Sequence, residues 1–495
     1  MKKFLYAAIL LLSATIVGCS EDTTYGSITL DHSAVYVGLE EYGAELYSSF
    51  TYSNIDEFEI YDTPLGWEAE VSYDSDTNTG MVTVYAPSRY YVGMDYTGDV
   101  IIQGTTNDET YTYAYLEVGM VDFIDLEATG QQANSMIVSE VGKVYLFNPN
   151  LRGESSVEAS TKATDCVLLW RSVGSPITGV KMYDNKIGFF TSYDENDLDE
   201  DGDEEDLIPG NAVIAALSDQ GAVIWSWHIW VTEFGIESTT INDVEFMNCN
   251  IGALGNSNAD YEETLDSYGL YYQWGRKDPF IQPYYYYAAG AIDAYLYNDS
   301  GSVKYAYYQA NSSTGFLGYS ITNPGSYIGG TEESLNDWLL PAHQRDDLWG
   351  GDSAEKSIYD PSPRGWRVPS MAELAVLGEA TEILVADDTR DLTDNDKDSY
   401  EYVYGATFDS NYFVAAGRRA YMNGSIQNYA PGELFKPWAG YYWSRDAAAN
   451  DSDGYKTASA LRFYLEGGDD GDGTIITETD SNYRAMGMQI RCVKY

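Results

Sequence analysis

The chain is poor in cysteine, histidine and basic residues for its 495 residues. Four Cys are too few for a disulfide scaffold. Only His32, His228 and His343 occur, widely spaced and without an H-E-x-x-H motif, so a His-based zinc site or a Ser-His-Asp triad has little material. Lys and Arg number 27 against 78 Asp and Glu, and the net charge of −51 disfavours a nucleic-acid partner because it repels phosphate.

Motifs of nucleotide-binding proteins and hydrolases are missing as well. The sequence contains neither G-x-x-x-x-G-K-[ST] nor G-x-S-x-G. A carboxylate pair for glycoside hydrolysis stays open, but 78 acids guarantee some close pairs and deprive that signal of specificity. We therefore expect a protein that is not an enzyme.

Apolar and aromatic residues are plentiful. They make up 44% and 15% of the chain, which argues against disorder and leaves room for about three domains. The 46 Tyr and 46 Gly favour many short strands joined by turns.

The amino terminus has the layout of a secretory signal. Lys2 and Lys3 precede the apolar run 4–12, which is too short to span a bilayer by itself. Residues 16–19, Ile-Val-Gly-Cys, resemble a bacterial lipobox, which implies removal of a 1–18 signal peptide and acylation of Cys19 with palmitate-like chains. No later run reaches 18 apolar residues.

The tripeptide 20–22, Ser-Glu-Asp, resembles the surface-export signal of Bacteroidetes lipoproteins, although an ordinary polar tether in an acidic chain would look the same. The expected location is the outer membrane, with the protein held by its lipid anchor and exposed at the cell surface. We expect no further membrane contact.

Residues 19–122 alternate with period two, and short strands are separated by turn clusters. In one segment Ala114, Leu116 and Val118 alternate with Tyr113, Tyr115 and Glu117. This pattern predicts an immunoglobulin-like β-sandwich that acts as a stalk.

Residues 123–241 form a second β-rich segment. Strands at 213–217 and 223–231 are predicted to make a hairpin around Asp219-Gln220-Gly221. Trp225, Trp227 and Ile229 would share one face and leave His228 on the other, which we interpret as a packed structural residue.

Residues 242–495 are rich in Tyr, Trp and Gly and predict an α+β domain. Ser370 and Glu373 have the S-x-x-E spacing of a capping box, followed by apolar residues at helical spacing. At the end of the chain Met488, Ile490 and Cys492 alternate as in a strand.

Four blocks in this last segment occur in a familiar order: 269–280 (GLYYQWGRKDPF), 365–370 (GWRVPS), 441–444 (YYWS) and 490–493 (IRCV). Together they resemble the Fibrobacter succinogenes major paralogous domain, which is frequent in surface lipoproteins of the Bacteroidetes. The resemblance implies a C-type-lectin-like fold whose terminal strand pairs near the start of the domain and whose loops form a binding face. It implies no reaction.

Two departures from this family concern cysteine. Cys249 stands where relatives usually have Arg, and Ser362 stands where they commonly have Cys. Cys492 has therefore lost the partner that the resemblance implies, which gives the hypothesis of a Cys249–Cys492 disulfide in an exported protein. Two buried thiols are the alternative.

Calcium is the best-supported metal. The stretch 194–206 carries ten acidic residues, and Asp197, Asp199, Asp201 and Gly202 match the first half of a D-x-D-x-D-G loop. Ile208 occupies the position of the bidentate Glu, which excludes a complete EF-hand. A solvated acidic loop is the alternative.

The run Tyr284, Tyr285, Tyr286 and Tyr287 is the predicted contact surface, because adjacent side chains of a strand point to opposite faces and cannot all be buried. Trp443 lies in one of the family blocks and is expected in the core.

The sequence thus predicts two immunoglobulin-like or sandwich-like stalk modules and a C-terminal C-type-lectin-like domain. The expected role is non-catalytic binding of a glycan or protein, as in an adhesin or fimbria-associated subunit. A carbohydrate-active enzyme using one carboxylate pair in the last domain, or a structural envelope protein, are the alternatives.

Overall fold

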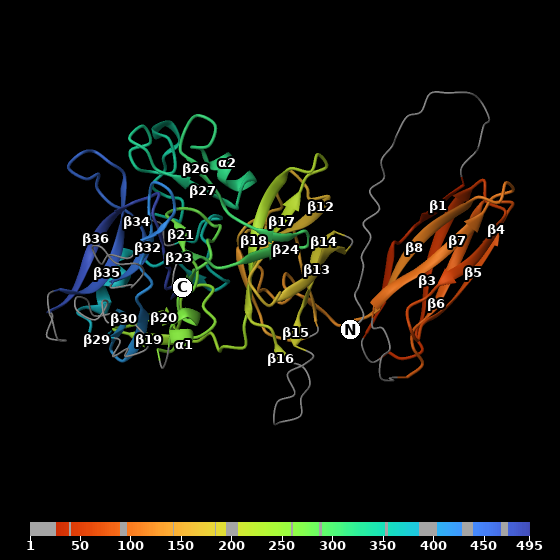
Figure 1. The fold of residues 1–495 in the computed structure, drawn as a ribbon, viewed down its shortest axis with the longest axis horizontal. Helices are drawn as coiled ribbons and strands as arrows, with labels where there is room; N and C mark the ends of the chain where they lie inside the picture. Colours follow the sequence, from red (N-terminus) through yellow and green to blue (C-terminus); the bar gives the residue numbers. More distant parts are fainter. Residues whose placement is uncertain are drawn as a thin grey trace. The chain divides into compact units, whose positions relative to one another are not determined.

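The structure is a computed structural model that describes residues 26–38, 41–89, 97–141, 143–183, 185–194, 206–258, 261–286, 290–351, 355–385, 403–427, 439–466 and 474–495. It divides into unit 1, residues 1–122, and unit 2, residues 123–495. The described residues are nearly all β-structure, as the many short strands in Figure 1 show.

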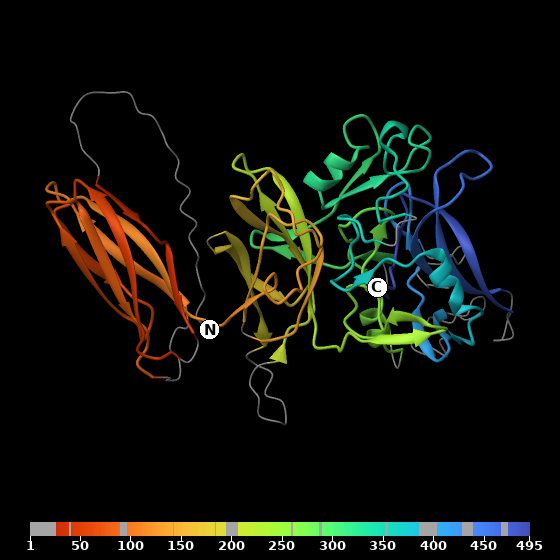
Figure 2. The same cartoon turned by 180° about the vertical axis from the view of Figure 1, so that it is seen from behind.

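Unit 1 contains two four-stranded sheets, drawn in red and orange in Figures 1 and 2. One sheet has the order β1-β3-β6-β5, with β1 (Ser27–Leu30), β3 (Glu45–Ser53), β6 (Thr79–Tyr85) and β5 (Glu68–Asp74). The other has the order β2-β8-β7-β4, with β2 (Ala34–Val37), β8 (Tyr111–Met120), β7 (Thr97–Thr105) and β4 (Glu57–Asp62).

The alternating pattern of unit 1 builds one core between these sheets. On β8 the side chains of Leu116 and Val118 are fully buried, whereas Tyr113 and Tyr115 point outward. Period two places alternate residues on opposite faces, so each strand contributes one apolar face. The predicted β-sandwich is confirmed, with a parallel β2–β8 pair at one edge.

Unit 2 begins with two sheets around a second core. The six-stranded sheet has the order β10-β18-β17-β12-β24-β25, with β10 (Ser135–Val138), β18 (Val223–Val231), β17 (Gly210–Leu217), β12 (Asp165–Arg171), β24 (Leu296–Asn298) and β25 (Gly301–Val303). The four-stranded sheet has the order β13-β14-β11-β9, with β13 (Ile177–Tyr183), β14 (Lys186–Thr191), β11 (Val144–Phe147) and β9 (Phe123–Asp125). The short pair β15 (Tyr193–Asp194) and β16 (Asp206–Leu207) flanks the acidic segment.

Strands β17 and β18 form the predicted hairpin and are buried on both faces, as their nearly continuous apolar sequences require. Trp225, Trp227 and Ile229 pack into the core between the two sheets, whereas Trp230 packs into the core formed with residues 247–492. Because β24 and β25 extend the same sheet, the structure differs from the expected division at 241/242: residues 123–495 form one unit.

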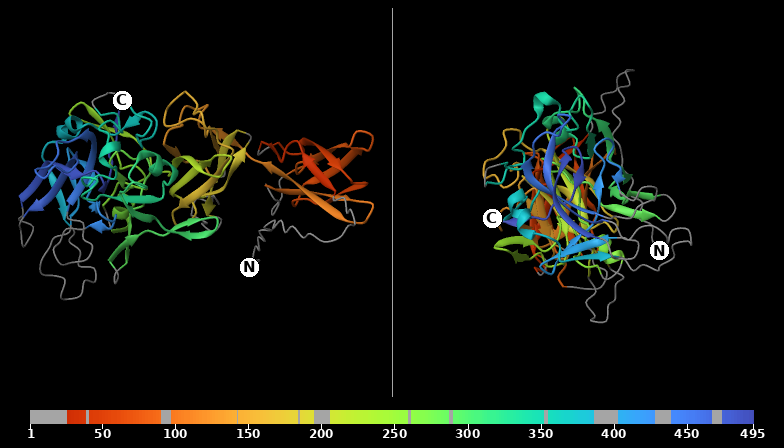
Figure 3. Two further views of the ribbon diagram at one scale, coloured as in Figure 1. Left: turned by 90° about the horizontal axis from the view of Figure 1, so that it is seen from above. Right: turned by 90° about the vertical axis from the view of Figure 1, so that its left-hand side faces the viewer.

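The remainder of unit 2 consists of small sheets and long loops (Figures 1 and 3). The sheet β19-β20-β38-β28 contains β19 (Ser238–Ile241), β20 (Val244–Met247), β38 (Val493–Lys494) and β28 (Trp366–Arg367). The sheet β21-β37-β32-β33 contains β21 (Tyr272–Gln273), β37 (Gly487–Met488), β32 (Arg418–Arg419) and β33 (Ile426–Gln427). Two three-stranded sheets contain β29 (Glu382–Val385), β30 (Val403–Phe408) and β31 (Asn411–Val414), and β34 (Ala439–Ala447), β35 (Thr457–Glu466) and β36 (Thr474–Tyr483).

Two strand pairs and a few short helices complete the described part. The pairs are β22 (Pro283–Tyr286) with β23 (Gly290–Asp293), and β26 (Ala306–Gln309) with β27 (Ser326–Gly329). The helices are α1 (Tyr261–Asp266), α2 (Leu317–Thr322), α3 (Met371–Leu374), and the 3₁₀ turns η1 (Pro341–His343) and η2 (Ala375–Leu377). In the part of the chain that is described, no helix is long and apolar enough to cross a membrane.

Three local predictions for the last segment are confirmed. Ser370 and Glu373 form a capping box at the start of α3, with both reciprocal hydrogen bonds present. Trp443 is fully buried and its Nε1–H donates to the Tyr272 carbonyl at 2.9 Å. The chain end pairs with the start of the segment, since Val493 on β38 faces Phe246 on β20.

Candidate functional site

A polar groove lies where the loops of unit 2 meet. Its volume is about 650 Å³. It is lined by Gln309, Ala310, Asn311, Gly330, Thr331, Glu332, Glu333, Asn336, Tyr421 and Met422. None of these side chains is basic, and those with polar groups are amides, carboxylates, one alcohol and one phenol.

The strand pair β26–β27 positions two sides of the groove. The strands are parallel, so the segments that follow Gln309 and Gly329 leave from the same end of the pair. The Gly330 amide donates to the Tyr421 carbonyl at 2.7 Å, which brings in the third segment. The groove is therefore assembled from residues more than 100 positions apart.

Two consecutive glycines let these backbones approach each other. A Cβ at Gly329 would lie 2.1 Å from the Met422 carbonyl oxygen, and one at Gly330 would lie 2.7 Å from the Asn336 carbonyl oxygen. Both distances are shorter than atoms can approach, so only glycine fits there.

The loop across the groove holds two residues in the left-handed region. Leu335 has φ 54° and Asn336 has φ 57°. Asn tolerates this region, whereas a branched residue such as Leu incurs strain, of order 1–3 kcal/mol per residue in sparsely populated backbone conformations. The Lys456 amide donates to the Leu335 carbonyl at 2.8 Å, and the Asn336 amide donates to the Thr331 carbonyl at 2.9 Å. Surrounding contacts thus impose the conformation that presents Asn336 to the groove.

Tyr421 and Met422 give the groove an aromatic and apolar border. Tyr421 packs edge-on against Tyr483 at 4.9 Å between ring centroids. Tyr307 on β26 is 44% exposed and its ring lies 6.0 Å from that of Tyr327, but it is not one of the residues that line the groove. Met422 is 52% exposed. The rim therefore offers apolar surface next to hydrogen-bonding groups.

Asp337, directly after the groove residue Asn336, is a buried acid with an incomplete set of partners. Its Oδ1 accepts from the Leu339 amide at 3.1 Å, while Oδ2 accepts no hydrogen bond. Burial raises the pKa of Asp337 to about 7, and Arg484, whose Nη1 lies 3.8 Å from Oδ2, offsets the rise only in part.

Buried arginines hold the loops of unit 2 in place. The guanidinium of Arg484 donates to the carbonyls of Thr457 and Arg345, both at 3.0 Å, and lies 4.5 Å from the centre of the Trp274 ring. Arg491 donates to the Tyr412 carbonyl at 3.0 Å and to Asn250 Oδ1 at 2.9 Å. A guanidinium has five N–H donors in a rigid fork, so one side chain satisfies several loop carbonyls at once.

Because these cations are buried, acidic side chains outnumber basic ones on the surface of unit 2 by more than its composition suggests. Among the described residues of unit 2, the buried basic ones are Arg276, Lys277, Arg367, Arg419, Arg445, Arg484 and Arg491, and the buried acidic ones are Asp278, Asp337 and Asp360. Because more basic than acidic side chains are buried, the balance of the exposed charged side chains is more acidic than the composition of the described residues.

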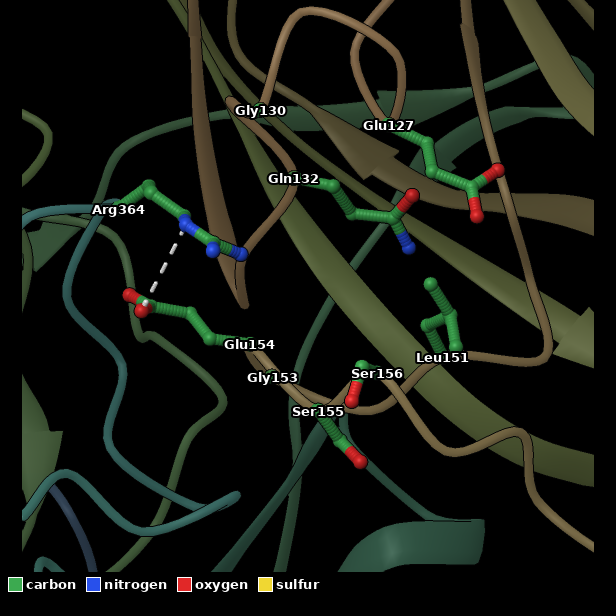
Figure 4. A pocket seen from close by; sticks show the side chains of 9 residues that line it. All are labelled: Glu127, Gly130, Gln132, Leu151, Gly153, Glu154, Ser155, Ser156 and Arg364. Atoms are coloured by element: carbon green, nitrogen blue, oxygen red, sulfur yellow. Dashed lines mark ion pairs between the residues drawn. The ribbon is translucent and has the colours of Figure 1, made fainter.

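A second, smaller pocket of about 220 Å³ lies at the edge of the first sheets of unit 2 (Figure 4). Arg364 and Glu154 point toward one another at one end of it, 3.8 Å apart. Lys356 Nζ and the Tyr495 hydroxyl also contact the Glu154 carboxylate, at 2.6 and 2.5 Å. These charges are satisfied within the protein and connect the chain end to Glu154, which is a structural role.

A serine, a histidine and an asparagine form a buried row that sequence reasoning missed. The Ser135 hydroxyl lies 2.5 Å from His228 Nδ1, and His228 Nε2 lies 2.8 Å from Asn211 Oδ1. Burial lowers the pKa of His228 to about 3, so the ring is neutral. All three side chains are at most 2% exposed, and no substrate reaches them; the row connects β10, β17 and β18.

The residues predicted to contact a ligand are only partly described. Tyr284, Tyr285 and Tyr286 lie on β22, but their side chains, and Tyr287 altogether, lie outside the described part. Asp197, Asp199 and Asp201 lie outside the described residues, as does Cys19. Within the described ranges, no three His, Cys, Asp or Glu side chains form a group that could hold a metal ion.

The structure differs from the disulfide hypothesis. Cys166, Cys249 and Cys492 are free thiols, and both Cys249 and Cys492 are fully buried. The Cys492 thiol donates to the Ser362 hydroxyl at 3.3 Å. Burial raises the pKa of the Cys249 thiol to about 12, which keeps it protonated and unreactive.

Comparisons with known proteins assign no family. No protein-family model and no curated protein matches the chain. Among solved structures, the D00-D0 domain of intimin aligns with 41% of this chain and 96% of its own at 9% identity and a TM-score of 0.16. The Bacteroides ovatus mixed-linkage glucan utilization protein SGBP-B aligns with 43% of this chain and 45% of its own at 10% identity and a TM-score of 0.12. The sialic acid binding region of a Streptococcus sanguinis adhesin aligns with 44% of this chain and 81% of its own at 8% identity and a TM-score of 0.16. Scores this low establish no common fold or ligand.

The groove itself was missed from the sequence. Its residues come from three segments separated by long stretches, and none belongs to a catalytic or metal motif. The only local signal is the pair Gly329-Gly330 after an apolar strand, which suggests a close backbone approach but does not say to what.

Proposed function

We propose that the protein binds a neutral glycan in the groove of unit 2 without transforming it. The observation that carries this proposal is the groove lining: amides, a hydroxyl and carboxylates beside the half-buried Tyr421, with no basic side chain among the described lining residues. Sugar hydroxyls both donate and accept hydrogen bonds, and amide and hydroxyl side chains match both roles.

The charges of the groove narrow the ligand class. Glu332 and Glu333 are exposed at its edge and accept hydrogen bonds from sugar hydroxyls. The same carboxylates, in a chain of net charge −51, repel sialylated, sulfated or phosphorylated glycans. The aromatic rim supplies a surface on which the apolar face of a sugar ring packs.

The family resemblance and the fold detail agree with this reading. In the C-type-lectin-like domain that the sequence resembles, the terminal strand pairs near the start and loops form the binding face. The β20–β38 pairing and the loop-built groove support assigning residues 242–495 to that fold. We further propose that Cys19 is acylated and holds the protein at the outer membrane, so that the groove faces glycans outside the cell.

A binding screen with paired variants tests the glycan proposal. Chain 20–495 is applied to an array of neutral and acidic oligosaccharides, and the affinity for the best ligand is measured by calorimetry. Tyr421→Ala is expected to weaken binding about fivefold to tenfold, the loss of roughly 1 kcal/mol of ring contact. The matched control is Tyr308→Ala, because Tyr308 is 48% exposed but is not one of the residues that line the groove.

Three outcomes would overturn the proposal: no neutral glycan binds saturably, both variants lose affinity equally, or acidic glycans bind best. The appearance of new reducing ends during incubation would instead identify a carbohydrate-active enzyme. Thermal melts of both variants show whether a lost affinity reflects unfolding.

A further inference from the structure

Unit 1 exposes a row of tyrosines on one sheet. Tyr111, Tyr113 and Tyr115 occupy alternate positions of β8 and are 58%, 41% and 55% exposed. Tyr61 on β4 is 60% exposed, and its ring packs edge-on against Tyr113 with 5.5 Å between centroids. We call these four residues the tyrosine face.

The tyrosine face is not required by the core of unit 1. The inward residues of the same strand, Leu116 and Val118, are fully buried and fill the sandwich. The four rings are exposed to solvent on one sheet, where they add little to the stability of the isolated unit. Tyrosine in this setting is typical of protein-binding surfaces, because it offers a large, rigid contact area at a small entropic cost.

The support beneath the rings is fixed by hydrogen bonds. Gln103, on the neighbouring strand β7, is 7% exposed, and its Nε2 donates to Glu59 Oε1 at 2.7 Å. At the other side of β8 the Tyr36 hydroxyl donates to Glu117 Oε1 at 2.7 Å. The face therefore combines aromatic rings with carboxylates held in defined positions.

Charge identifies the partner. Residues 26–122 contain 18 acidic residues and a single basic residue, Arg89. Because Arg89 is the only Lys or Arg in residues 26–122, this segment cannot supply a cation to each carboxylate and each tyrosine ring. A partner bearing Lys or Arg supplies both the opposite charge and the cations that tyrosine rings attract.

We propose that the tyrosine face docks a lysine- or arginine-bearing segment of another protein. The proposal goes beyond glycan binding in the groove and is independent of it, since the two surfaces belong to different units. A neutral glycan is the less favoured occupant here, because it gains nothing from the field of 18 carboxylates.

The experiment uses chain 20–495 and a labelled 16-residue peptide of alternating Arg and Gly, with fluorescence anisotropy as the readout. The triple variant Tyr111→Ser, Tyr113→Ser, Tyr115→Ser is expected to bind about tenfold more weakly, since each exposed cation–π contact accounts for roughly twofold to fivefold. Raising NaCl from 50 to 300 mM should weaken the complex of the wild-type protein with the peptide, because salt screens the attraction between opposite charges.

Controls separate the tyrosine face from the overall charge. Tyr47→Ser removes a tyrosine of 51% exposure from the opposite sheet of the same unit and should leave the affinity unchanged. Replacing the three β8 tyrosines by Phe keeps the rings and should preserve binding, which also covers the case in which the serine variant fails to fold. A peptide with Glu in place of Arg should not bind.

Two results would overturn the proposal. If both the serine and the phenylalanine variants bind the Arg peptide like the wild type, only the diffuse field is at work. If neutral oligosaccharides bind in a manner that depends on these tyrosines while the Arg peptide does not bind, the face is a glycan surface. Neither result affects the groove, whose test uses Tyr421 and Tyr308.

Discussion

The buried acid Asp337 makes a pH-dependent prediction. In the unfolded chain Asp has a pKa of 3.8, whereas burial raises the pKa of Asp337 to about 7 in the folded state. Between these values the unfolded chain releases a proton that the folded protein keeps, so the stability contributed by Asp337 falls as pH rises from about 4 to about 7. Above pH 7 the burial of ionised Asp337 lowers the free energy of unfolding by about 4 kcal/mol, because the pKa values of the folded and unfolded states differ by about three units at 1.36 kcal/mol each.

The variant Asp337→Asn removes this titration while keeping the shape of the side chain. Its Oδ1 still accepts from the Leu339 amide, and Arg484 keeps Asp346 Oδ1 at 2.6 Å as a charged partner. We expect the variant to be more stable than the wild type at pH 8. This advantage should be about 2–3 kcal/mol smaller at pH 5, where part of the penalty has not yet developed.

Urea unfolding followed by tryptophan fluorescence measures this difference. Ten of the eleven Trp residues lie in unit 2, and Trp338 is the next residue after Asp337, so the signal reports on the right unit. The pH range stays above the isoelectric point near 4.1. Asp346→Asn is the control, because Asp346 is 64% exposed and its removal should give no gain that grows with pH. The reasoning is wrong if Asp337→Asn is less stable than the wild type at pH 8, since Asp337 would then be ionised and paired with Arg484.

Three further predictions concern the same unit. Burial by itself would raise the pKa of Glu373, but hydrogen bonds from Arg367 and the Ser370 cap lower it to about 2. Glu373→Gln should therefore destabilise unit 2 by about 2–3 kcal/mol at pH 7, and this difference in stability should disappear as the pH falls toward 2. Urea titrations at several pH values measure it. Gly330→Ala forces a Cβ against the Asn336 backbone, so it should lower the stability of unit 2 by about 1–3 kcal/mol and also weaken glycan binding. An unchanged melting temperature and affinity would contradict the close approach of the two backbones. Thiol titration of unreduced, urea-unfolded chain 20–495 should find three reactive thiols; a single thiol would establish the Cys249–Cys492 disulfide after all.

Local features were the easiest to predict from sequence. The alternation along 111–118, the hairpin at 217–223 and the capping box at 370–373 each depend on residues a few positions apart, so period and turn chemistry suffice. The boundary expected at 241/242 does not separate compact units, because the two segments share a core. Trp170, Val213 and Trp230 look like ordinary strand residues, and nothing in their own segment says that they pack against residues 247–492.

The candidate sites show the same limit. The predicted contact tyrosines 284–287 were chosen because they are adjacent in sequence, whereas the groove brings together Gln309, Gly330 and Tyr421 across more than 100 residues. Its shape depends on Gly329 and Gly330 beside two other backbones, and those neighbours cannot be inferred from the glycines themselves. The exposure of the tyrosine face was visible as a pattern, but its alternating tyrosines also fit a stalk.

The sequence alone determined the charge of this protein, its β-rich class and the faces of individual strands, because these depend on composition and on short-range periodicity. The tertiary structure decided which segments share a core, where the basic residues go and which loops form a groove. Those outcomes depend on contacts between distant segments: a buried guanidinium binds whichever loop carbonyls surround it, and no local pattern says which loops those will be.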